Sequence, residues 1–259
     1  MKIGVFDSGL GGLVITKAFI EKLPEYDYFY YGDSIHLPYG EKTSGQILSY
    51  SLAAMRYMIS QGCKIIIIAC NTATSISLRY IQQRFIPQYA PDIKVLGVVI
   101  PTVEVSLQNN IKRVGIVATS ATIRSHIYQQ ELEKINPNID VVEIAAPELV
   151  PAIENNKFEL AEEFVKEYSR SFKNVDSLIL GCTHYPLIKE YFRKYLPGVY
   201  IVSQDELMAE KLQDYLQRHP EIESFLGRNG LREFKVSSFN KHSQKVATNL
   251  FTDIAITKA

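Results

Sequence analysis

The sequence predicts an α/β protein of two pseudo-symmetric lobes, each a mostly parallel sheet flanked by helices, with the active site in the cleft between them. Short β-branched or aromatic runs alternate with amphipathic stretches, a pattern typical of parallel sheets covered by helices. The chain also repeats weakly: residues 2–8 align with residues 113–119 at an offset of 111, and Cys70 aligns with Cys182 at an offset of 112. With 259 residues, 46% of them hydrophobic, it can bury a substantial core.

The expected strands are short runs rich in β-branched and aromatic residues, bounded by polar or turn-forming residues. In chain order they cover residues 2–6, 28–31, 64–69, 94–99, 113–117, 141–144, 177–180, 199–202 and 233–236. The expected helices carry apolar residues at helical spacing. They include residues 44–60, 122–135, 159–171 and 206–218, whereas the polar residues 218–232 are expected to form a loop.

Two boundaries divide these elements into lobes. Pro91 and Asp92 are turn-forming residues before a new strand and mark the first boundary. A return crossing near residues 203–205 lets the last helix and strand complete the first lobe. The first lobe is therefore expected to comprise residues 1–92 plus 206–259, with Cys70, and the second lobe residues 93–205, with Cys182.

Composition limits the class of partner. Lys plus Arg and Asp plus Glu both number 28, so the formal net charge is zero, and neither nucleic acid nor an anionic membrane is an expected partner. A small molecule is favoured instead. No apolar run is long enough to cross a bilayer and no secretory signal precedes the first strand, so we expect a cytoplasmic protein. The three cysteines are expected to be reduced.

A glycine-rich turn from Asp7 to Gly12 (Asp-Ser-Gly-Leu-Gly-Gly) follows the first strand and opens a helix. Such a position suits a ligand carboxylate or phosphate. Val14 stands where a dinucleotide fingerprint needs its third glycine, and no Gly-Lys-Ser/Thr follows, so a nucleotide cofactor is disfavoured. The simpler alternative is a turn in which Asp7 or Ser8 only caps the helix.

Cys70 and Cys182 each end a buried strand and precede a hydroxyl-rich segment that starts a helix. Free N–H groups at a helix start favour negative charge, which lowers the pKa of a cysteine. We therefore expect two reactive thiols, with His184 placed either to polarise a thiol or to donate to substrate. An isolated cysteine is more often a small buried hydrophobe, the interpretation we prefer for Cys63. A metal site is disfavoured, because two cysteines and one histidine are too few ligands for zinc and no Cys-x-x-Cys spacing occurs.

The repeat predicts how these residues meet. If the two halves face each other across a pseudo-two-fold axis, the ends of corresponding strands bring Ser8, Cys70, Thr119 and Cys182 into one cleft. The two thiols would then flank one ligand.

Two further segments have weaker signals. Gly32-Asp33 and Pro38-Tyr39-Gly40 bracket a loop after the second strand, at the sheet edge where α/β proteins bind ligands, although a simple turn is the alternative. Glu154 follows an apolar stretch, and its default interpretation is a solvated helix acid.

Four motifs in this order closely resemble those of the glutamate racemase family: the turn from Asp7 to Gly12, Gly32-Asp33 with Pro38-Tyr39-Gly40, Ala69 to Ala73 (Ala-Cys-Asn-Thr-Ala), and Leu180 to Pro186 (Leu-Gly-Cys-Thr-His-Tyr-Pro). The resemblance implies a cofactor-independent enzyme that interconverts L- and D-glutamate to supply peptidoglycan synthesis. In this family one thiolate removes the α-proton and the opposite thiol reprotonates the other face. The resemblance assigns Cys70 to the D enantiomer and Cys182 to the L enantiomer.

The remaining roles also come from the resemblance. Substrate contacts of the family fall on Asp7, Ser8, Tyr39, Gly40, Asn71, Thr72, Thr183 and His184, second-lobe hydroxyls on Thr119 and Thr122, and supporting polar groups on Asp7, His184 and Glu154. No cofactor and no metal are implied. The chain departs from the family pattern at Ile35-His36, at residues 100–102 and at Ala118, which puts regulatory contacts in doubt.

Three alternatives stay open. The first is another activity of the same superfamily, such as aspartate racemisation. The second is a thiol hydrolase that uses Cys182 and His184, with Cys70 structural. The third is a non-catalytic module that binds an amino acid. The oligomeric state is not determined by the sequence, and a homodimer is one expectation.

Overall fold

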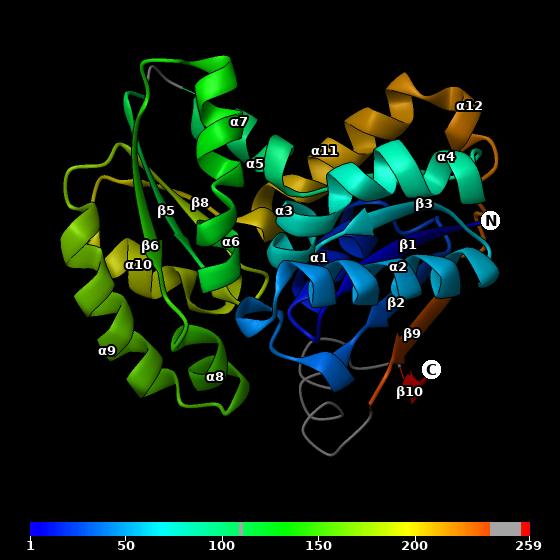
Figure 1. Cartoon of the computed structure of the whole chain (residues 1–259), viewed down its shortest axis with the longest axis horizontal. Helices are drawn as coiled ribbons and strands as arrows, with labels where there is room; N and C mark the ends of the chain where they lie inside the picture. The colour runs from blue at the N-terminus through cyan, green and yellow to red at the C-terminus, as the bar shows by residue number, and fades with distance from the viewer. Residues whose placement is uncertain (109–110, 239–254) are drawn as a thin grey trace.

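The computed structural model describes residues 1–108, 111–238 and 255–259. Two parallel sheets organise them (Figure 1). The first sheet has the order β10-β9-β2-β1-β3-β4 and the second the order β6-β5-β7-β8, and neighbouring strands in both orders are parallel. The strands are β1 (Lys2–Asp7), β2 (Tyr28–Gly32), β3 (Cys63–Ile68), β4 (Lys94–Gly97), β5 (Arg113–Ala118), β6 (Asp140–Ala145), β7 (Ser177–Gly181), β8 (Tyr200–Val202), β9 (Arg232–Val236) and β10 (Ile256–Lys258).

The predicted α/β class and the two lobes are confirmed. We call the part built on the first sheet the first lobe and the part built on the second sheet the second lobe. The order β2-β1-β3-β4 in one lobe corresponds to β6-β5-β7-β8 in the other, so β1 is equivalent to β5 and β3 to β7. The weak sequence repeat therefore reflects a repeat of strand order.

Helices cover both faces of each sheet. The first sheet lies between α1 and α11 on one face and α2 and α3 on the other, and the second between α5 and α7 on one face and α8, α9 and α10 on the other (Figure 1). The helices are α1 (Gly12–Lys22), α2 (Ser44–Ser60), α3 (Asn71–Tyr80), α4 (Ile86–Tyr89), α5 (Val99–Ser106), α6 (Ser120–Ser125), α7 (Ile127–Ile135), α8 (Leu149–Glu154), α9 (Phe158–Ser169), α10 (Lys189–Tyr195), α11 (Gln204–Arg218) and α12 (Pro220–Glu223).

One predicted helix has the bounds that the sequence indicates. Helix α2 covers residues 44–60 because a reciprocal capping pair starts it. The Thr43 hydroxyl accepts from the Gln46 N–H at 3.3 Å, and the Gln46 side chain accepts from the Thr43 N–H at 3.0 Å. Together they satisfy N–H groups that have no partner within the helix.

Other predicted bounds are wrong. The expected helix 122–135 is two helices, because His126 has a left-handed backbone (φ 51°) and separates α6 from α7. The expected loop 218–232 contains the short helix α12. The boundary expected after residue 92 is also wrong, since Lys94–Gly97 pairs with β3 in the first sheet. We propose that the chain crosses from the first lobe to the second after Gly97 and returns at residues 203–205. Residues 239–254 of the expected first lobe fall outside the described part of the chain.

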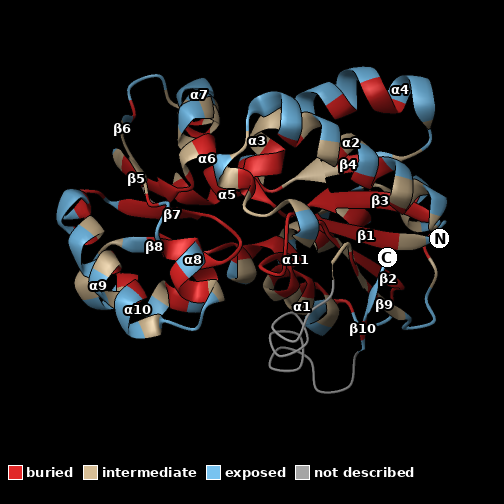
Figure 2. Cartoon of the chain, turned by 60° about the horizontal axis from the view of Figure 1, so that its bottom comes forward, coloured by how far each residue is buried: buried red, intermediate tan, exposed pale blue. Residues whose placement is uncertain are grey.

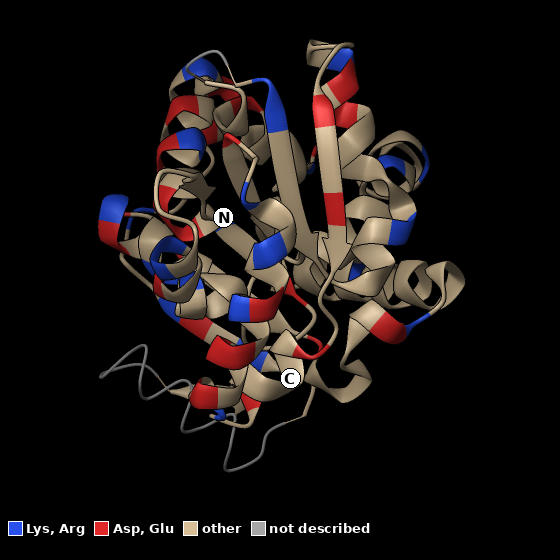
Figure 3. Ribbon diagram, turned by 90° about the vertical axis from the view of Figure 1, so that its left-hand side faces the viewer, with Lys and Arg blue, Asp and Glu red and all other residues tan. Residues whose placement is uncertain are grey.

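A continuous apolar core joins the lobes. One cluster of buried side chains includes residues of α1 and α11 from the first lobe and of α5 and α7 from the second. Figure 2 shows that the strands at the centre of both lobes are largely buried. Charged residues of both signs are interspersed over the outer helices (Figure 3). Within the described ranges no helix is both long and apolar enough to cross a membrane.

Candidate active site

The first thiol, Cys70, lies where the chain leaves β3 and enters α3. Its side chain is only 5% exposed, its Sγ accepts from the Ala73 N–H at 3.4 Å as the helix cap, and it donates to Ser8 Oγ at 3.4 Å. Burial and the nearby Asp7 charge nevertheless raise the pKa of Cys70 to about 12, and the two hydrogen bonds offset this only in part. The lowered pKa expected for this residue is wrong, because desolvation outweighs the helix terminus.

The second thiol, Cys182, follows β7, but no α-helix begins directly after it. A 3₁₀ turn at Tyr185–Ile188 comes first, and α10 starts only at Lys189. Cys182 contacts a histidine in place of a helix N-terminus. Its Sγ lies 3.7 Å from Nδ1 of His184, and Nε2 of His184 lies 3.0 Å from Oε1 of Glu154.

The His184 imidazole is buried, which by itself lowers the pKa of a histidine. Its contacts with Cys182 and Glu154 outweigh burial and raise the pKa of His184 well above the ordinary value. The raised pKa favours a protonated His184, which lies between the Cys182 sulfur and the Glu154 carboxylate. Glu154 is therefore more than the solvated helix acid of its default interpretation.

Both thiols line one small cavity of about 40 Å³ between the lobes. Cys182 is 6% exposed, so the two thiols are almost equally shielded from solvent. The cavity wall includes Ser8, Tyr39, Gly40, Cys70, Asn71, Thr72, Thr119, Cys182, Thr183 and His184, together with Leu37, Pro38, Glu41, Ser120, Pro147, Val150 and Pro151. The three predicted site residues Asp7, Thr122 and Glu154 contact this wall from behind.

Asp7 is completely buried at the end of β1 and ties the two lobes together. Its Oδ2 accepts from the Gly9 N–H at 3.0 Å, and its Oδ1 accepts from the Thr183 hydroxyl of the second lobe at 3.1 Å. Burial raises the pKa of Asp7 although His184 and these hydrogen bonds act in the opposite direction. Gly11 lies against the same second-lobe segment, where a Cβ atom would stand 2.6 Å from Thr183 Oγ1.

Three hydroxyl groups from the two lobes meet at one point of the cavity. Thr72 Oγ1 lies 2.8 Å from Thr119 Oγ1 and 3.2 Å from Thr122 Oγ1, and Thr119 lies 3.1 Å from Thr122. Hydroxyls can donate or accept, so the cluster can turn its donors toward an anionic ligand.

The loop after β2 brings Tyr39 and Gly40 to the cavity. The Tyr39 hydroxyl donates to Oδ2 of the buried Asp33 at 2.7 Å, and Asp33 also contacts Nδ1 of His36 at 2.8 Å. Asp33 thus anchors the loop, a role that its position after β2 did not reveal.

Sequence reasoning missed the partners of Asn71. The Asn71 side chain exchanges two hydrogen bonds with Gln204 and accepts a third from Tyr128, so its amide faces the joint between the lobes. No pattern in the sequence marks Gln204. The sequence also carries no separate signal for the apolar side of the cavity, which Pro147, Val150 and Pro151 form; these residues stand out only as the stretch before Glu154.

No group of three or more His, Cys, Asp or Glu suited to a metal occurs in the described part of the chain.

Comparison with known proteins identifies the family. The model of the Asp/Glu/hydantoin racemases matches residues 15–211, most of the chain. The chain belongs to this racemase family. A curated relative, the glutamate racemase of Ruegeria pomeroyi, is 38% identical over 238 residues, which are 86% of this chain and 87% of the relative.

Solved racemases share the two-lobe fold. The glutamate racemase of Francisella tularensis, solved in complex with D-glutamate, superposes with a TM-score of 0.87 and 34% identity over 99% of this chain and 95% of that one. An aspartate racemase of Picrophilus torridus gives a TM-score of 0.62 and 25% identity over 84% of this chain and 95% of that one. The chain is thus more similar to this glutamate racemase than to this aspartate racemase.

Proposed function

We propose that this racemase interconverts L- and D-glutamate without a cofactor, by proton transfer between Cys70 and Cys182. One observation carries the proposal: two free thiols from equivalent strands of two repeated lobes line the same buried cavity. The activity is that of the glutamate racemases to which the chain is similar, and its D-glutamate would supply peptidoglycan synthesis in the cytoplasm. A homodimer stays a prediction.

The chemistry requires a strong base in a dry site. The α-proton of an amino acid is weakly acidic, so its removal needs a base that is close, oriented and shielded from water. A thiolate on one face removes this proton, and a thiol on the other face donates its own to the opposite side of the α-carbon. Because each sulfur can accept or donate, the reaction runs in both directions.

The two thiols begin a turnover in different states. Cys70, with a pKa of about 12, starts as the proton donor. Cys182, beside the His184 imidazolium, starts as the base. With Cys182 as the base, the enzyme can remove the α-proton of L-glutamate, the enantiomer that the resemblance assigns to Cys182. After one turnover the states are exchanged, and Cys182 must lose its proton again before the next L-glutamate is converted.

We assign the substrate's carboxylates to the polar walls of the cavity. The hydroxyls of Ser8, Thr72 and Thr119 and the backbone N–H groups at the start of α3 are the donors available there. The Thr183 hydroxyl also faces the cavity but donates to Asp7. Asp7, Thr122 and Glu154 support these groups from behind.

A thiol hydrolase is the second candidate, because Cys182, His184 and Glu154 form a nucleophile–base–acid series. Such an enzyme would not need a second thiol opposite the first. The Cys70 variant therefore separates the two functions.

The experiment replaces Cys70 and Cys182 singly by Ser and measures racemisation of both glutamate enantiomers by polarimetry. We expect each variant to lose two-way racemisation by at least about a thousandfold, since a serine hydroxyl is a far weaker acid and base at neutral pH. Each variant should still eliminate the β-leaving group from one enantiomer of 3-chloroglutamate, which requires only one base.

Full racemisation by either variant would refute the two-thiol reaction. Hydrolysis of a thioester or amide that survives in Cys70→Ser and disappears in Cys182→Ser would favour the hydrolase. Cys63→Ser is the matched control, because Cys63 is buried in the first-lobe core away from the cavity.

A further inference from the structure

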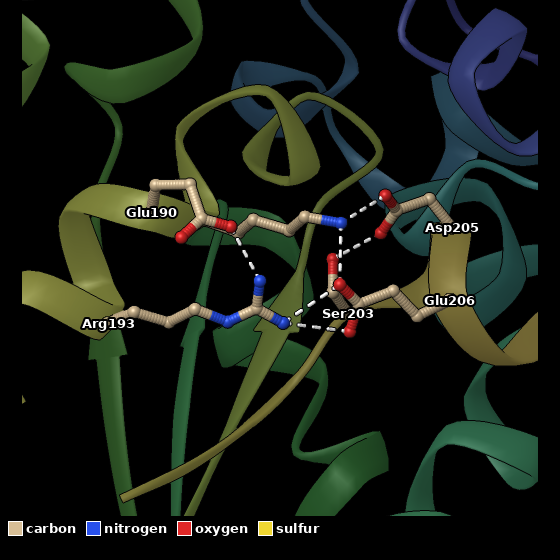
Figure 4. A network of polar contacts seen from close by, with 6 residues as sticks. Glu190, Arg193, Ser203, Asp205 and Glu206 are labelled. Atoms are coloured by element: carbon tan, nitrogen blue, oxygen red, sulfur yellow. Dashed lines mark hydrogen bonds and ion pairs between the residues drawn. The ribbon is translucent and has the colours of Figure 1, made fainter. Parts of the chain in front are cut away.

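The segment Ser203–Glu206, which we call the crossing segment, lies where the chain passes from β8 of the second lobe into α11, which packs against α1 of the first lobe. Its side chains point in two directions. Gln204 is fully buried and points inward, whereas Asp205 and Glu206 take part in a network of ion pairs with α10 (Figure 4). The segment therefore contacts the surroundings of both thiols.

The inward contact reaches the residue next to Cys70. Gln204 Oε1 accepts from Asn71 Nδ2 at 2.9 Å, and Gln204 Nε2 donates to Asn71 Oδ1 at 2.8 Å. The same Nε2 lies 3.2 Å from Thr102 Oγ1 in α5. Two reciprocal bonds between planar amides allow little freedom, so Gln204 determines where Asn71 and the start of α3 lie.

The outward contacts reach the helix that follows Cys182. Lys189, the first residue of α10, lies 2.6 Å from Asp205 and 2.6 Å from Glu206. Arg193, one turn later, donates to both oxygens of Glu206 at 2.8 and 2.9 Å (Figure 4). Only Tyr185–Ile188 separates α10 from His184.

Several features make this network stronger than a typical surface ion pair. The Lys189 side chain is 19% exposed and the Asp205 side chain 18%. Burial lowers the pKa of Lys189, but its two carboxylate partners outweigh burial and raise it. Asp205 and Glu206 also lie in the first turn of α11, where acidic side chains are favourable.

We propose that the crossing segment sets the separation of the two thiols, with Gln204 and Lys189 as positioning residues that act through Asn71 and α10. This inference rests on the proposed function, because only a two-thiol reaction depends on that separation. Both sulfurs must reach one α-carbon from opposite faces, and a displacement of about 1 Å can slow such a step about a hundredfold.

The test compares a reaction that needs both thiols with one that needs a single thiol. Racemisation of glutamate needs both. Elimination from L-3-chloroglutamate needs one: a thiolate takes the α-proton, the electron pair of the Cα–H bond forms a Cα–Cβ double bond, and chloride leaves. The resulting enamine takes up water and yields 2-oxoglutarate and ammonia, which are measured with a coupled assay.

We expect Gln204→Met and Lys189→Met to lower kcat for racemisation at least about tenfold, with KM for glutamate and the elimination rate each changed less than about threefold. Lys189→Arg, which keeps the charge and both carboxylates within reach, should restore racemisation. Gln217→Leu and Asp214→Asn on the exposed part of α11 are the matched controls and should leave both reactions unchanged.

A parallel loss of racemisation and elimination, or no loss of either, would overturn the inference while leaving the proposed function intact. If Gln204→Met does not fold, Lys189→Met, whose site is near the surface, gives the same comparison. Absence of racemisation in the unsubstituted protein would refute the proposed function, and the inference with it.

Discussion

At the scale of single residues, the two thiols differ in their surroundings although the sequence presents them alike. Cys70 caps a helix, but its burial and the nearby Asp7 charge raise its pKa. Cys182 has no helix start beside it and contacts His184 instead. The symmetry of the fold therefore does not extend to the polar contacts of the two sulfurs.

This difference predicts selective alkylation. The thiolate is the nucleophile, and both sulfurs are about equally shielded, so iodoacetamide at pH 7.5 should modify Cys182 before Cys70. Peptide mass spectrometry measures both sites in one sample. Since the pKa of Cys70 is about 12, its labelling rate should rise about tenfold for each pH unit between 8 and 10.

Cys63 is the internal control, because burial raises its pKa to about 12 as well and it lies in the core. In His184→Asn the preference for Cys182 should disappear. Equal or faster labelling of Cys70 in the unsubstituted protein at pH 7.5 would contradict the assigned resting state.

The sequence predicted Cys70 and Cys182 correctly as residues of one cavity, because strand ends and the repeat depend on local pattern and order. Its prediction of a lowered pKa is wrong for Cys70. A pKa depends on burial and on charges brought from distant parts of the chain, such as Asp7 beside Cys70 and Glu154 beside His184. Gln204 was missed for the same reason: its partner Asn71 is 133 residues away.

At the scale of elements, the C-terminal part of the first lobe depends on one buried carboxylate. Asp27, just before β2, is 5% exposed and accepts from the N–H groups of Asn229 and Leu231 at 3.0 and 2.9 Å. These bonds hold the turn that leads into β9. Burial raises the pKa of Asp27, but the hydrogen bonds outweigh it and lower the pKa below its usual value.

We predict that Asp27→Asn lowers the free energy of unfolding at pH 7 by about 2 kcal/mol, since hydrogen bonds to a buried charge are lost. A lowered pKa stabilises the folded state above the unfolded pKa of about 3.9 and loses this effect as the pH falls through the folded value. The difference in free energy of unfolding between wild type and Asp27→Asn should therefore shrink below about pH 4. Urea unfolding at several pH values measures it.

Asp92→Asn, at an exposed position in the turn before β4, is the matched control and should change stability little. A difference between wild type and Asp27→Asn that stays constant down to pH 3 would contradict the role given to the Asp27 carboxylate.

Element bounds were predictable where local signals decide them. The capping pair of Thr43 and Gln46 lies within four residues, and α2 has its predicted bounds. The break at His126 depends on a left-handed backbone that few residues other than glycine adopt, so the apolar spacing across residues 122–135 concealed it. The membership of β4 in the first sheet depends on its pairing with β3, which no local pattern encodes.

At the scale of the whole molecule, the reaction depends on close approach of the lobes. Two glycines of the first lobe lie directly against the second: a Cβ at Gly11 would stand 2.6 Å from Thr183 Oγ1, and one at Gly40 would stand 2.9 Å from Thr119 Cβ. Both thiols are at most 6% exposed in this arrangement, so the closely packed lobes shield them from water.

We predict that Gly11→Ala lowers kcat/KM for glutamate at least about tenfold with little change in Tm. Gly11 has an ordinary right-handed backbone (φ −58°), so alanine fits the start of the helix. The unfavourable contact of its Cβ is with Thr183 of the other lobe. Gly45→Ala in α2, where nothing lies within 4 Å of the added Cβ, is the matched control for steady-state kinetics and thermal unfolding. Unchanged kinetics in Gly11→Ala would contradict a requirement for this approach.

Proton NMR in deuterated water tests most directly whether the protein is a two-thiol glutamate racemase. L- and D-glutamate are incubated separately with the protein and no added cofactor, and the α-proton signal and the enantiomer ratio are followed together. We predict that the α-proton signal disappears as the opposite enantiomer forms, from either starting enantiomer. Retention of the α-proton, or loss of it without inversion, would contradict the claim.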